Sequence, residues 1–299
     1  MIDSDYQLVR LASGAFSIHS KAEGETFHPV VGPVAEAQAL YVNQLKLRER
    51  VRSQTGEFVI WDVGLGAAAN VLTALRATRD LSCSLHVISF DRTLAPLQFA
   101  LRHSAQLGYL APYESAVQAL LQTGRADFKH GRQSVRWRLR LGDFPQFLRR
   151  PGPAPAPRAI MFDAFSPAKN PAMWTAPLFS DLFHALDPHR PCAMPTYSRS
   201  TMLRVTLLLA GFYVGIGRAT GEKEETTIAA NTLELIDEPL PAAWLRRARR
   251  SKSAEPLWEP VYRQARLSPE TWEKLRQHPQ WITARQPGGD ALPKGAQQK

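Results

Sequence analysis

Residues 158–174 read RAIMFDAFSPAKNPAMW, and the fold can be worked out from this segment. Its first half is an apolar run that stops at Asp163, the pattern of a short buried strand. Ser-Pro and Asn-Pro pairs follow and predict a turn. Ligands of an open α/β sheet bind outside the carboxyl ends of its strands, so Asp163 is a candidate to accept a proton or a hydrogen bond from a substrate. The alternative is that Asp163 only caps the turn.

A second predicted strand is followed by glycines. Residues 58–63 read FVIWDV, typical of a buried parallel strand, and Gly64-Leu65-Gly66 follows. A helix that includes Asn70 comes next. Nucleotide-type cofactors use this order, because glycines let the backbone approach a ligand and the helix start offers free N–H groups. The third glycine of the dinucleotide fingerprint is replaced by Ala69, which disfavours a pyrophosphate site.

Two more predicted strands end in acids. Residues 85–91 form an apolar run that ends at Asp91, about 20 residues beyond the glycines, the offset at which an acid binds ribose hydroxyls. A helix N-cap is the alternative role for Asp91. Residues 134–141 alternate apolar and basic side chains, as in a half-exposed strand, and Asp143 and Phe144 follow.

The remaining segments complete an α/β pattern. Helices are predicted between the strands, and the last elements are a strand and a hairpin. Their ranges are 34–50, 94–102, 112–123, 177–186 and 202–210 for the helices, 192–197 for the strand, and 211–217 with 225–230 for the hairpin. Strands that alternate with helices predict a mainly parallel sheet covered on both faces, and the hairpin adds an antiparallel edge.

The N-terminal part contains two titratable residues of interest. Residues 13–20 suggest a short hairpin or an extended arm. For His28, which precedes a proline, the alternatives are a ligand-facing role and a structural one, and a lone histidine beside a proline is more often structural. Glu36 lies near the start of the helix predicted at residues 34–50, where a carboxylate interacts favourably with the helix dipole.

Bulk composition excludes several classes of protein. The 299 residues include two cysteines and no C-x-x-C pair, which indicates neither a disulfide framework nor a metal site. The N-terminus lacks the order of a signal peptide, and the most apolar run, residues 202–217, is too short to span a bilayer. We therefore expect a cytoplasmic protein without membrane contact or bound metal. The net charge of +10 makes a polyanion a plausible partner.

Most of that charge is C-terminal. From residue 241 onward there are 12 Lys and Arg against 5 Asp and Glu, a net charge of +7. The densest cluster, residues 246–252, includes Arg246 and Arg247, and tryptophan and tyrosine side chains are interleaved with it. Two interpretations remain open: an arm that contacts RNA through phosphates and stacked bases, or a solvated helix whose aromatic residues dock on the core. Residues 286–299 are expected to be disordered.

Residues 163–175, DAFSPAKNPAMWT, resemble one known family. It comprises the S-adenosylmethionine-dependent methyltransferases that complete 5-methylaminomethyl-2-thiouridine at the wobble position of tRNA, either as the methyltransferase half of MnmC or as its stand-alone counterpart. Supporting matches are Asp62-Val63-Gly64-Leu65-Gly66 with Asn70, residues 88–91, Gly142-Asp143, residues 196–198 before Arg204, and residues 209–217. The resemblance extends from about residue 14 to residue 230.

This resemblance implies a fold and a set of roles. The fold is a class I methyltransferase, Rossmann-like sheet of seven strands, which agrees with the strands predicted above. From the segments themselves we expect the methyltransferase domain at 51–240, an N-terminal arm and helix at 1–50 and a basic extension at 241–299. The resemblance implies that the cofactor S-adenosyl-L-methionine is bound by Asp62, Gly64, Gly66, Asn70, Asp91, Asp143 and Phe144. Asp163 should face the aminomethyl group of the modified uridine. Candidate contacts with substrate or RNA are Phe165, Lys169, Arg199, Arg204, Arg246 and Arg247.

The sequence departs from the family pattern in places. The family usually has a glycine where this chain has Ala68, and often Glu at Asp91, which can loosen cofactor contacts. No flavin-dependent oxidase half is recognised, so we expect a substrate that already carries the aminomethyl group. Alternatives are a class I methyltransferase that acts on another amine, a nicotinamide-dependent Rossmann oxidoreductase, or an RNA-binding protein with a degenerate methyltransferase fold.

Overall fold

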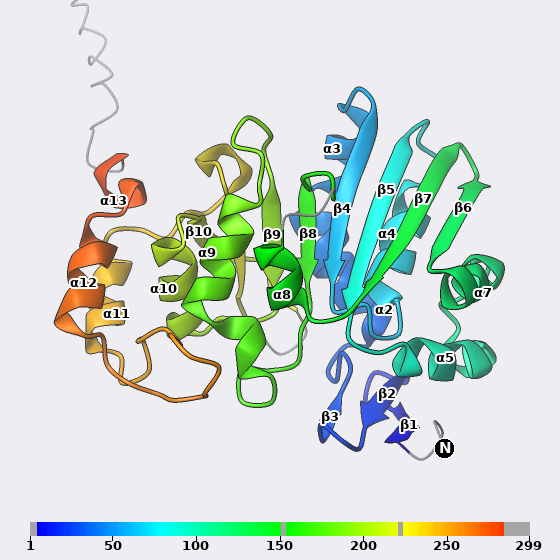
Figure 1. The fold of residues 1–299 in the computed structure, drawn as a ribbon, viewed down its shortest axis with the longest axis horizontal. Helices are drawn as coiled ribbons and strands as arrows, with labels where there is room; N and C mark the ends of the chain where they lie inside the picture. Colours follow the sequence, from blue (N-terminus) through cyan, green and yellow to red (C-terminus); the bar gives the residue numbers. More distant parts are fainter. Residues whose placement is uncertain (1–4, 151–153, 221–223, 284–299) are drawn as a thin grey trace, which may run out of the picture.

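An eight-stranded sheet forms the centre of the molecule in a computed structural model that describes residues 5–150, 154–220 and 224–283 (Figure 1). The strand order is β10-β11-β9-β8-β4-β5-β7-β6. Five strands run parallel, namely β4 (Glu57–Val63), β5 (Ser84–Asp91), β7 (Gln133–Leu141), β8 (Ala159–Phe162) and β9 (Ala193–Thr196). Three pair antiparallel, namely β6 (Arg125–His130), β10 (Tyr213–Gly217) and β11 (Thr226–Ala230). The predicted mainly parallel sheet with a closing hairpin is confirmed.

Strand β6 was not predicted, and it makes the sheet one strand larger than the resemblance implied. It pairs antiparallel with β7, at the edge of the sheet. Its six residues alternate between exposed and covered positions, and a tight turn through Gly131, which has a φ of 61°, leads into β7. A short edge strand next to a helix carries a weak sequence signal, because it lacks the apolar run of a central strand.

Helices cover both faces of the sheet. On one face lie α4 (Ala69–Thr78), α5 (Ala95–Arg102), α6 (Ser104–Leu107) and α7 (Glu114–Thr123); on the other lie α8 (Phe144–Arg149), α9 (Ala176–His184) and α10 (Thr201–Leu209). Strand β4 serves both cores: Phe58 and Ile60 belong to the first, Val59 and Trp61 to the second. This alternation follows from the period of two of a strand.

The helix predicted at residues 34–50 is divided into three pieces. These are α2 (Pro33–Ala37), the π-helical segment η1 (Gln38–Gln44) and α3 (Leu47–Arg52). The break lies at Lys46, whose φ of 49° is left-handed. The apolar residues still face the core, because Leu40, Tyr41 and Leu47 are all fully buried.

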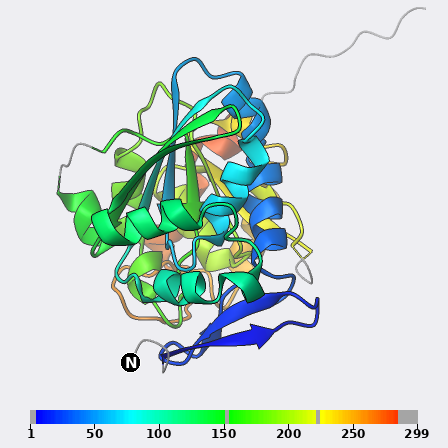
Figure 2. The same ribbon diagram turned by 90° about the vertical axis from the view of Figure 1, so that its right-hand side faces the viewer.

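The predicted N-terminal hairpin is a small sheet of its own. It consists of β1 (Tyr6–Arg10), β2 (Phe16–Ser20) and β3 (Glu25–Thr26) in antiparallel order. Figure 2 shows this sheet below the main one. We call residues 5–37, from β1 to α2, the N-terminal arm.

The basic C-terminal segment docks on the main sheet. We call residues 241–283 the C-terminal extension; it contains α11 (Trp244–Arg250), α12 (Pro269–Arg276) and α13 (Pro279–Thr283). Trp244, Leu275 and Trp281 are buried in the second core. The expected disorder of residues 286–299 lies outside the described residues. Short 3₁₀ segments, η2 (Pro171–Trp174) and η3 (Leu233–Leu235), complete the fold.

Residues 5–150, 154–220 and 224–283 include no helix with both the length and the apolar character that a bilayer-spanning segment needs.

Candidate functional site

A pocket of about 600 Å³ lies where the parallel strands end. Its walls come from the segments that follow β4, β5, β7 and β8 and from the N-terminal arm. The volume lies in the range of small-molecule and cofactor sites. The pocket brings together most of the expected site residues, namely Gly64, Gly66, Asn70, Asp91, Asp143, Phe144, Asp163 and Phe165.

The turn between β4 and α4 approaches the end of β8 very closely. Gly64 has a φ of 93°, and a Cβ atom there would lie only 2.6 Å from the carbonyl oxygen of Asp163. Only glycine fits, for reasons of both backbone angle and space. The same turn carries Ala68 at a φ of 63°, so the departure from the family's glycine is accommodated in a strained, left-handed conformation.

Asp91 ties the end of β5 to the glycine turn. Its carboxylate accepts hydrogen bonds from the backbone N–H of Gly66, at 2.9 Å, and from that of Thr93, at 3.1 Å. Burial raises the pKa of Asp91, and the backbone donors oppose the rise. The carboxylate also lines the pocket, at the place where the sequence predicted an acid for ribose hydroxyls.

Asp143 and Phe144 form another part of the wall. Asp143 caps α8, where its side chain accepts a hydrogen bond from the backbone N–H of Gln146 at 3.2 Å. Phe144 is buried, and its ring packs edge-on against Phe90 with the centroids 5.0 Å apart. An aromatic wall with a neighbouring acid suits a planar, polar-edged ring such as adenine.

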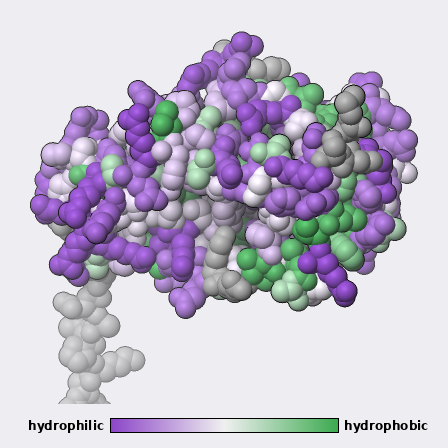
Figure 3. Space-filling view, turned by 90° about the horizontal axis from the view of Figure 1, so that it is seen from below, coloured by the Kyte–Doolittle hydropathy of each residue, from purple (hydrophilic) through white to green (hydrophobic). Residues whose placement is uncertain are grey.

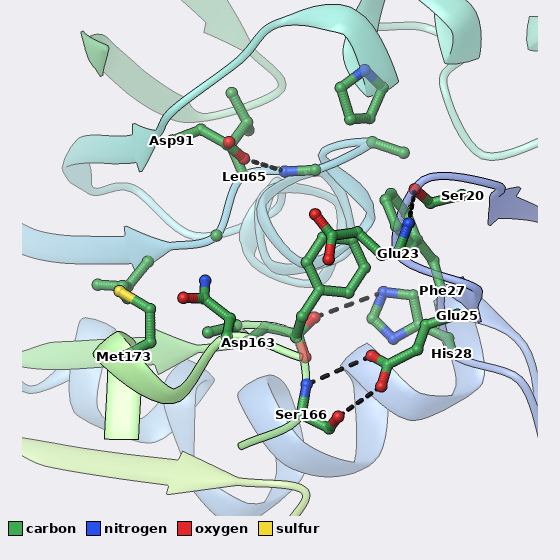
Figure 4. Close-up of a pocket in the computed structure, with 18 of the residues that line it drawn as sticks. Ser20, Glu23, Glu25, Phe27, His28, Leu65, Asp91, Asp163, Ser166 and Met173 are labelled. Carbon is green, nitrogen blue, oxygen red and sulfur yellow. Dashed lines mark hydrogen bonds and ion pairs between the residues drawn. The ribbon is translucent and has the colours of Figure 1, made fainter. Parts of the chain in front are cut away.

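Asp163 follows β8 and meets side chains from two other elements (Figure 4). Asn70, on α4, donates from its side-chain amide to Asp163 Oδ2 at 2.8 Å. The Nε2 atom of His28 lies 3.6 Å from the same oxygen. The Asp163 side chain retains 16% of its exposure, so a ligand in the pocket can reach it.

His28 and Glu36 are site residues that the sequence reasoning missed. Nδ1 of His28 lies 3.4 Å from Glu36 Oε1, so the ring stands between two carboxylates. Burial alone would lower the pKa of His28, but the nearby carboxylates of Asp163 and Glu36 raise it to about 9. No sequence pattern links these residues, because the arm must first fold back onto the end of β8.

The same three residues are types that bind metal ions, and they are grouped closely enough for one. However, the imidazole turns a different nitrogen toward each carboxylate. A single ion bound to one nitrogen would have to break one of these two contacts. The arrangement therefore suits a chain of charges better than a metal centre. The absence of a metal remains a prediction.

The N-terminal arm also contacts the segment after Asp163. Glu25 accepts hydrogen bonds from the backbone N–H and the hydroxyl of Ser166, at 3.3 and 2.5 Å. The rings of Phe27 and Phe165 lie 5.5 Å apart. These contacts close the pocket on the side of the arm, as Figure 4 shows for Glu25 and Ser166.

Asp62 is a correction to the expected cofactor residues. It is fully buried within β4, and its neighbour Val63 lines the pocket instead. Asp62 Oδ2 accepts a hydrogen bond from the Ser89 hydroxyl at 2.7 Å. Burial raises its pKa to about 7, which the Ser89 hydrogen bond partly opposes. The Asp62 side chain therefore links β4 to Ser89 on β5 and does not line the pocket.

Arg204 is a second correction, because it cannot reach a phosphate from its place in α10. The side chain is 1% exposed. Its guanidinium donates to the Thr227 hydroxyl at 3.0 Å and to the Thr226 carbonyl at 2.8 Å. It anchors α10 to β11. The other expected RNA contacts, Lys169, Arg199, Arg246 and Arg247, are exposed and lie outside the pocket.

The residues present fit S-adenosyl-L-methionine. The turn after β4 is glycine-rich, an acid stands at the end of β5, and an aromatic wall with Asp143 lies beyond it. Asn70 Oδ1 is buried without a hydrogen-bond partner among the described residues, so a polar acceptor remains at the start of α4. Such an atom is costly to bury unless a ligand or water satisfies it.

Comparison with known proteins agrees with this geometry. Residues 108–232 match the sequence model of a family described as S-adenosyl-L-methionine-dependent methyltransferase. The bifunctional protein MnmC of tRNA 5-methylaminomethyl-2-thiouridine biosynthesis from Pseudomonas putida is 28% identical over 239 residues, which are 77% of this chain and 35% of that protein. The protein of the same name from Ralstonia nicotianae is 30% identical over 252 residues, 78% of this chain and 34% of that protein. The chain thus spans about a third of the length of these relatives.

Solved structures show the same fold. The crystal structure of MnmC2 from Aquifex aeolicus superposes with a TM-score of 0.66 at 24% identity, and covers 91% of this chain and 83% of that one. A spermidine synthase has a TM-score of 0.51 at 9% identity over 91% of this chain and 81% of that one. The fold is therefore that of the Rossmann-like methyltransferases.

Proposed function

We propose that this chain, an MnmC-like methyltransferase with S-adenosyl-L-methionine as its cofactor, methylates the primary amine of 5-aminomethyl-(2-thio)uridine at the wobble position of tRNA. The product would be 5-methylaminomethyl-(2-thio)uridine. The observation that carries the proposal is Asp163, a partly exposed carboxylate held by Asn70 and His28 in the pocket at the end of β8. The nucleoside is the one in the name of the MnmC relatives.

Several pocket residues would hold the cofactor. Gly64 and Gly66 leave the backbone open to its methionine part, and Asn70 lies beside them at the start of α4. Asp91 would accept hydrogen bonds from the ribose hydroxyls, and Asp143 with Phe144 would contact the adenine. Asp62 would act from behind the turn, through β4, without touching the ligand.

The chemistry assigned to Asp163 follows from the substrate. When bound, S-adenosyl-L-methionine would supply an electrophilic methyl group on its sulfonium, and breakage of that S–C bond would leave S-adenosylhomocysteine. A primary alkyl amine is mostly protonated at neutral pH, and only its free lone pair can form the new N–C bond. Asp163 would take the proton, or hold the amine so that its lone pair faces the methyl group. Positioning would supply much of the remaining acceleration.

The RNA-binding surface would lie on the C-terminal extension. In Figure 3 the end of the molecule that carries it is mostly hydrophilic. Arg246, Arg247, Arg249 and Arg250 are exposed on α11. Beyond them, residues 258–266 are all exposed, and they include Trp258 at 49% and Tyr262 at 41%. Cations that meet phosphates and exposed aromatics that stack on bases are the usual means of binding unpaired RNA.

This surface is joined to the pocket by the backbone. The N–H of Ala176 donates to the carbonyl of Leu257 at 2.8 Å, and Thr175 pairs with Leu257 as a β-bridge. Met173, two residues earlier, lines the pocket. A tRNA bound on the extension would therefore lie close to the pocket in which its wobble nucleoside reacts. Phe165, Lys169 and Arg199 are further candidate contacts, at the rim.

A nucleoside assay tests the proposal. Purified protein, S-adenosyl-L-methionine and tRNA that carries 5-aminomethyl-2-thiouridine are incubated, and the digested nucleosides are analysed by mass spectrometry. The expected result is a gain of one methyl group on that nucleoside, and turnover lower by about 10²-fold or more in Asp163→Asn. Asp127→Asn is the matched control, because Asp127 only pairs with Arg138 at the exposed edge of the sheet.

The outcomes separate the alternatives. Methylation of another amine, with this nucleoside untouched, would reject the substrate and keep the enzyme class. S-adenosylhomocysteine should raise the melting temperature, and NADH should leave it unchanged. The opposite result would favour the reductase alternative, and cofactor binding without any transfer would favour a degenerate RNA-binding protein.

A further inference from the structure

His28 has an unusual setting for a histidine that was expected to be structural. It lies in the loop between β3 and α2 of the N-terminal arm, and the two carboxylates that flank it come from α2 of the same arm and from the end of β8. The His28 side chain is 9% exposed, Glu36 10% and Asp163 16%. Three polar side chains from three segments thus meet in a space nearly closed to water, at the wall of the pocket.

The backbone at His28 is also unusual. Its φ of 48° is left-handed, a conformation that favours glycine, and Pro29 follows. A strained non-glycine residue persists where its surroundings fix it, and such residues cluster at functional sites. With this backbone conformation, Nε2 of the ring faces Asp163 and Nδ1 faces Glu36.

Other titratable groups around the cluster carry no compensating charge. Tyr41 and Tyr197 donate their hydroxyls to the carbonyls of Phe162 and Ala164, on either side of Asp163. Burial, followed by the charges of the surrounding carboxylates, raises their pKa values well above the usual range, so they stay neutral; for Tyr197 these carboxylates include Glu25. Asp62 lies behind, and burial raises its pKa to about 7. His28 is therefore the cation that can balance Asp163 and Glu36 from within the cluster.

We propose that Glu36 and His28 form a charged chain that ends on Asp163, in which the protonated imidazole keeps the Asp163 carboxylate ionised and turned toward the reacting amine. His28 is thus a positioning residue for the reaction, and Glu36 holds its ring. This inference rests on the proposed function for its consequence in turnover, but the charge state of His28 is independent of the substrate.

Removal of the imidazolium should change the ionisation of Asp163. In His28→Gln two carboxylates would remain close together without a cation between them, which raises the pKa of one of them. The acid limb of the pH dependence of kcat/KM should therefore move to higher pH. We expect kcat to fall by up to about 10²-fold, the effect of a misplaced catalytic group, with the KM for S-adenosyl-L-methionine little changed.

The experiment combines kinetics with NMR titration. His28→Gln and the isosteric Glu36→Gln are compared with wild type in tRNA methylation between pH 5.5 and 9.5, and the ring protons of His28 are assigned from the signal lost in His28→Gln. We expect His28 to titrate near pH 9 in wild type. In Glu36→Gln the midpoint should be lower, because one of the two carboxylates is gone. His19→Gln is the control, since His19 contacts the Thr26 hydroxyl on the same arm.

Several outcomes would overturn the inference. A wild-type His28 that titrates near its ordinary pH of about 6.5 would show that the imidazole is not charged at neutral pH. A loss of kcat in His28→Gln with an unmoved acid limb would indicate a purely structural role. If the tRNA substrate is wrong, the NMR titration still decides the charge of His28, so the two failures can be told apart. If His28→Gln does not fold, the titration midpoint of His28 in Glu36→Gln still tests the inference, because it should be lower than in wild type.

Discussion

The N-terminal arm and the C-terminal extension each contain a buried histidine, and the two differ in charge. His28, in the arm, has a pKa raised to about 9, because Asp163 and Glu36 more than offset the effect of burial. His278, in the extension, has a pKa lowered to about 4 by burial alone, beside the rings of Tyr213 and Trp281. The arm presents charge inward to a reacting group, whereas the extension buries neutral side chains and presents its charge outward.

The difference indicates that the N-terminal arm and the C-terminal extension have separate roles. Both contact the segment after β8: the arm through Glu25 and Ser166, and the extension through Leu257 and Thr175. The first contact joins polar side chains, and the second joins backbone to backbone. Changes in the arm should therefore act on chemistry, and changes in the extension on stability and RNA affinity.

The largest effect is expected for Trp281→Ala. Trp281 is 2% exposed, stacks on Trp244 and donates to the Leu275 carbonyl at 2.8 Å. Its truncation should lower the free energy of unfolding by about 3–5 kcal/mol, measured by urea denaturation. Trp258→Ala, at an exposed position, should stay within about 0.5 kcal/mol of wild type. Turnover per folded molecule should be normal in both variants at saturating tRNA. A loss of turnover in fully folded Trp281→Ala would contradict the idea that the extension affects stability and RNA affinity but not chemistry.

The next effect is a pH dependence of stability with opposite signs in the two regions. His28 binds its proton more tightly when folded, so its stabilisation is present below pH 6.5 and lost as the pH rises toward 9. His278 binds it more weakly when folded, so stability falls as the pH drops from 6.5 toward 4. Each contribution is at most about 3–4 kcal/mol.

Unfolding curves between pH 4 and 9.5 check these signs. His28→Gln should flatten the alkaline side of the profile, and His278→Gln the acidic side. If both substitutions changed the same side, the comparison between the two regions would be wrong.

A smaller effect is expected in RNA binding. Trp258→Ala should weaken tRNA affinity by about 1–3 kcal/mol if one base stacks on the indole. Arg247→Ala should remove one phosphate contact. The slope of the logarithm of the binding constant against the logarithm of the salt concentration should therefore become less steep by about 1. Arg132→Ala is the control, since Arg132 is equally exposed but lies in the turn between β6 and β7. Filter binding at several salt concentrations measures all three. Equal losses in Arg247→Ala and Arg132→Ala, with no loss in Trp258→Ala, would mean that net charge alone, and no defined surface, binds the RNA.

The smallest effect concerns the turn that lies between the two regions. Ala68 and His28 both have left-handed backbones, but only His28 is held by charged partners. Ala68→Gly should therefore raise the free energy of unfolding by about 1 kcal/mol, because glycine adopts this conformation without strain. Thermal unfolding with and without S-adenosylhomocysteine would measure it. A destabilised Ala68→Gly would show that the methyl group packs well enough to offset the strain.

The parallel part of the fold could be predicted from sequence because each strand is an apolar run that ends at a polar residue. This pattern located Asp91, Asp143 and Asp163 at one edge, and the structure places all three on the pocket. Asp62 and Arg204 were misjudged, because sequence does not show which side of a strand or helix faces a ligand. The group of His28, Glu36 and Asp163 depends on how the arm docks, which no local pattern encodes.

The C-terminal extension has a further consequence for the edge of the sheet. The side-chain amide of Gln280 pairs with both the N–H and the carbonyl of Val214 on β10, at 2.8 and 2.9 Å. Glu238 and Leu240 bond to the same strand. An uncovered edge strand invites pairing with another chain. Gln280 of the extension and the preceding residues Glu238 and Leu240 thus cover this edge together, and we expect a chain that lacks residues 238–283 to self-associate.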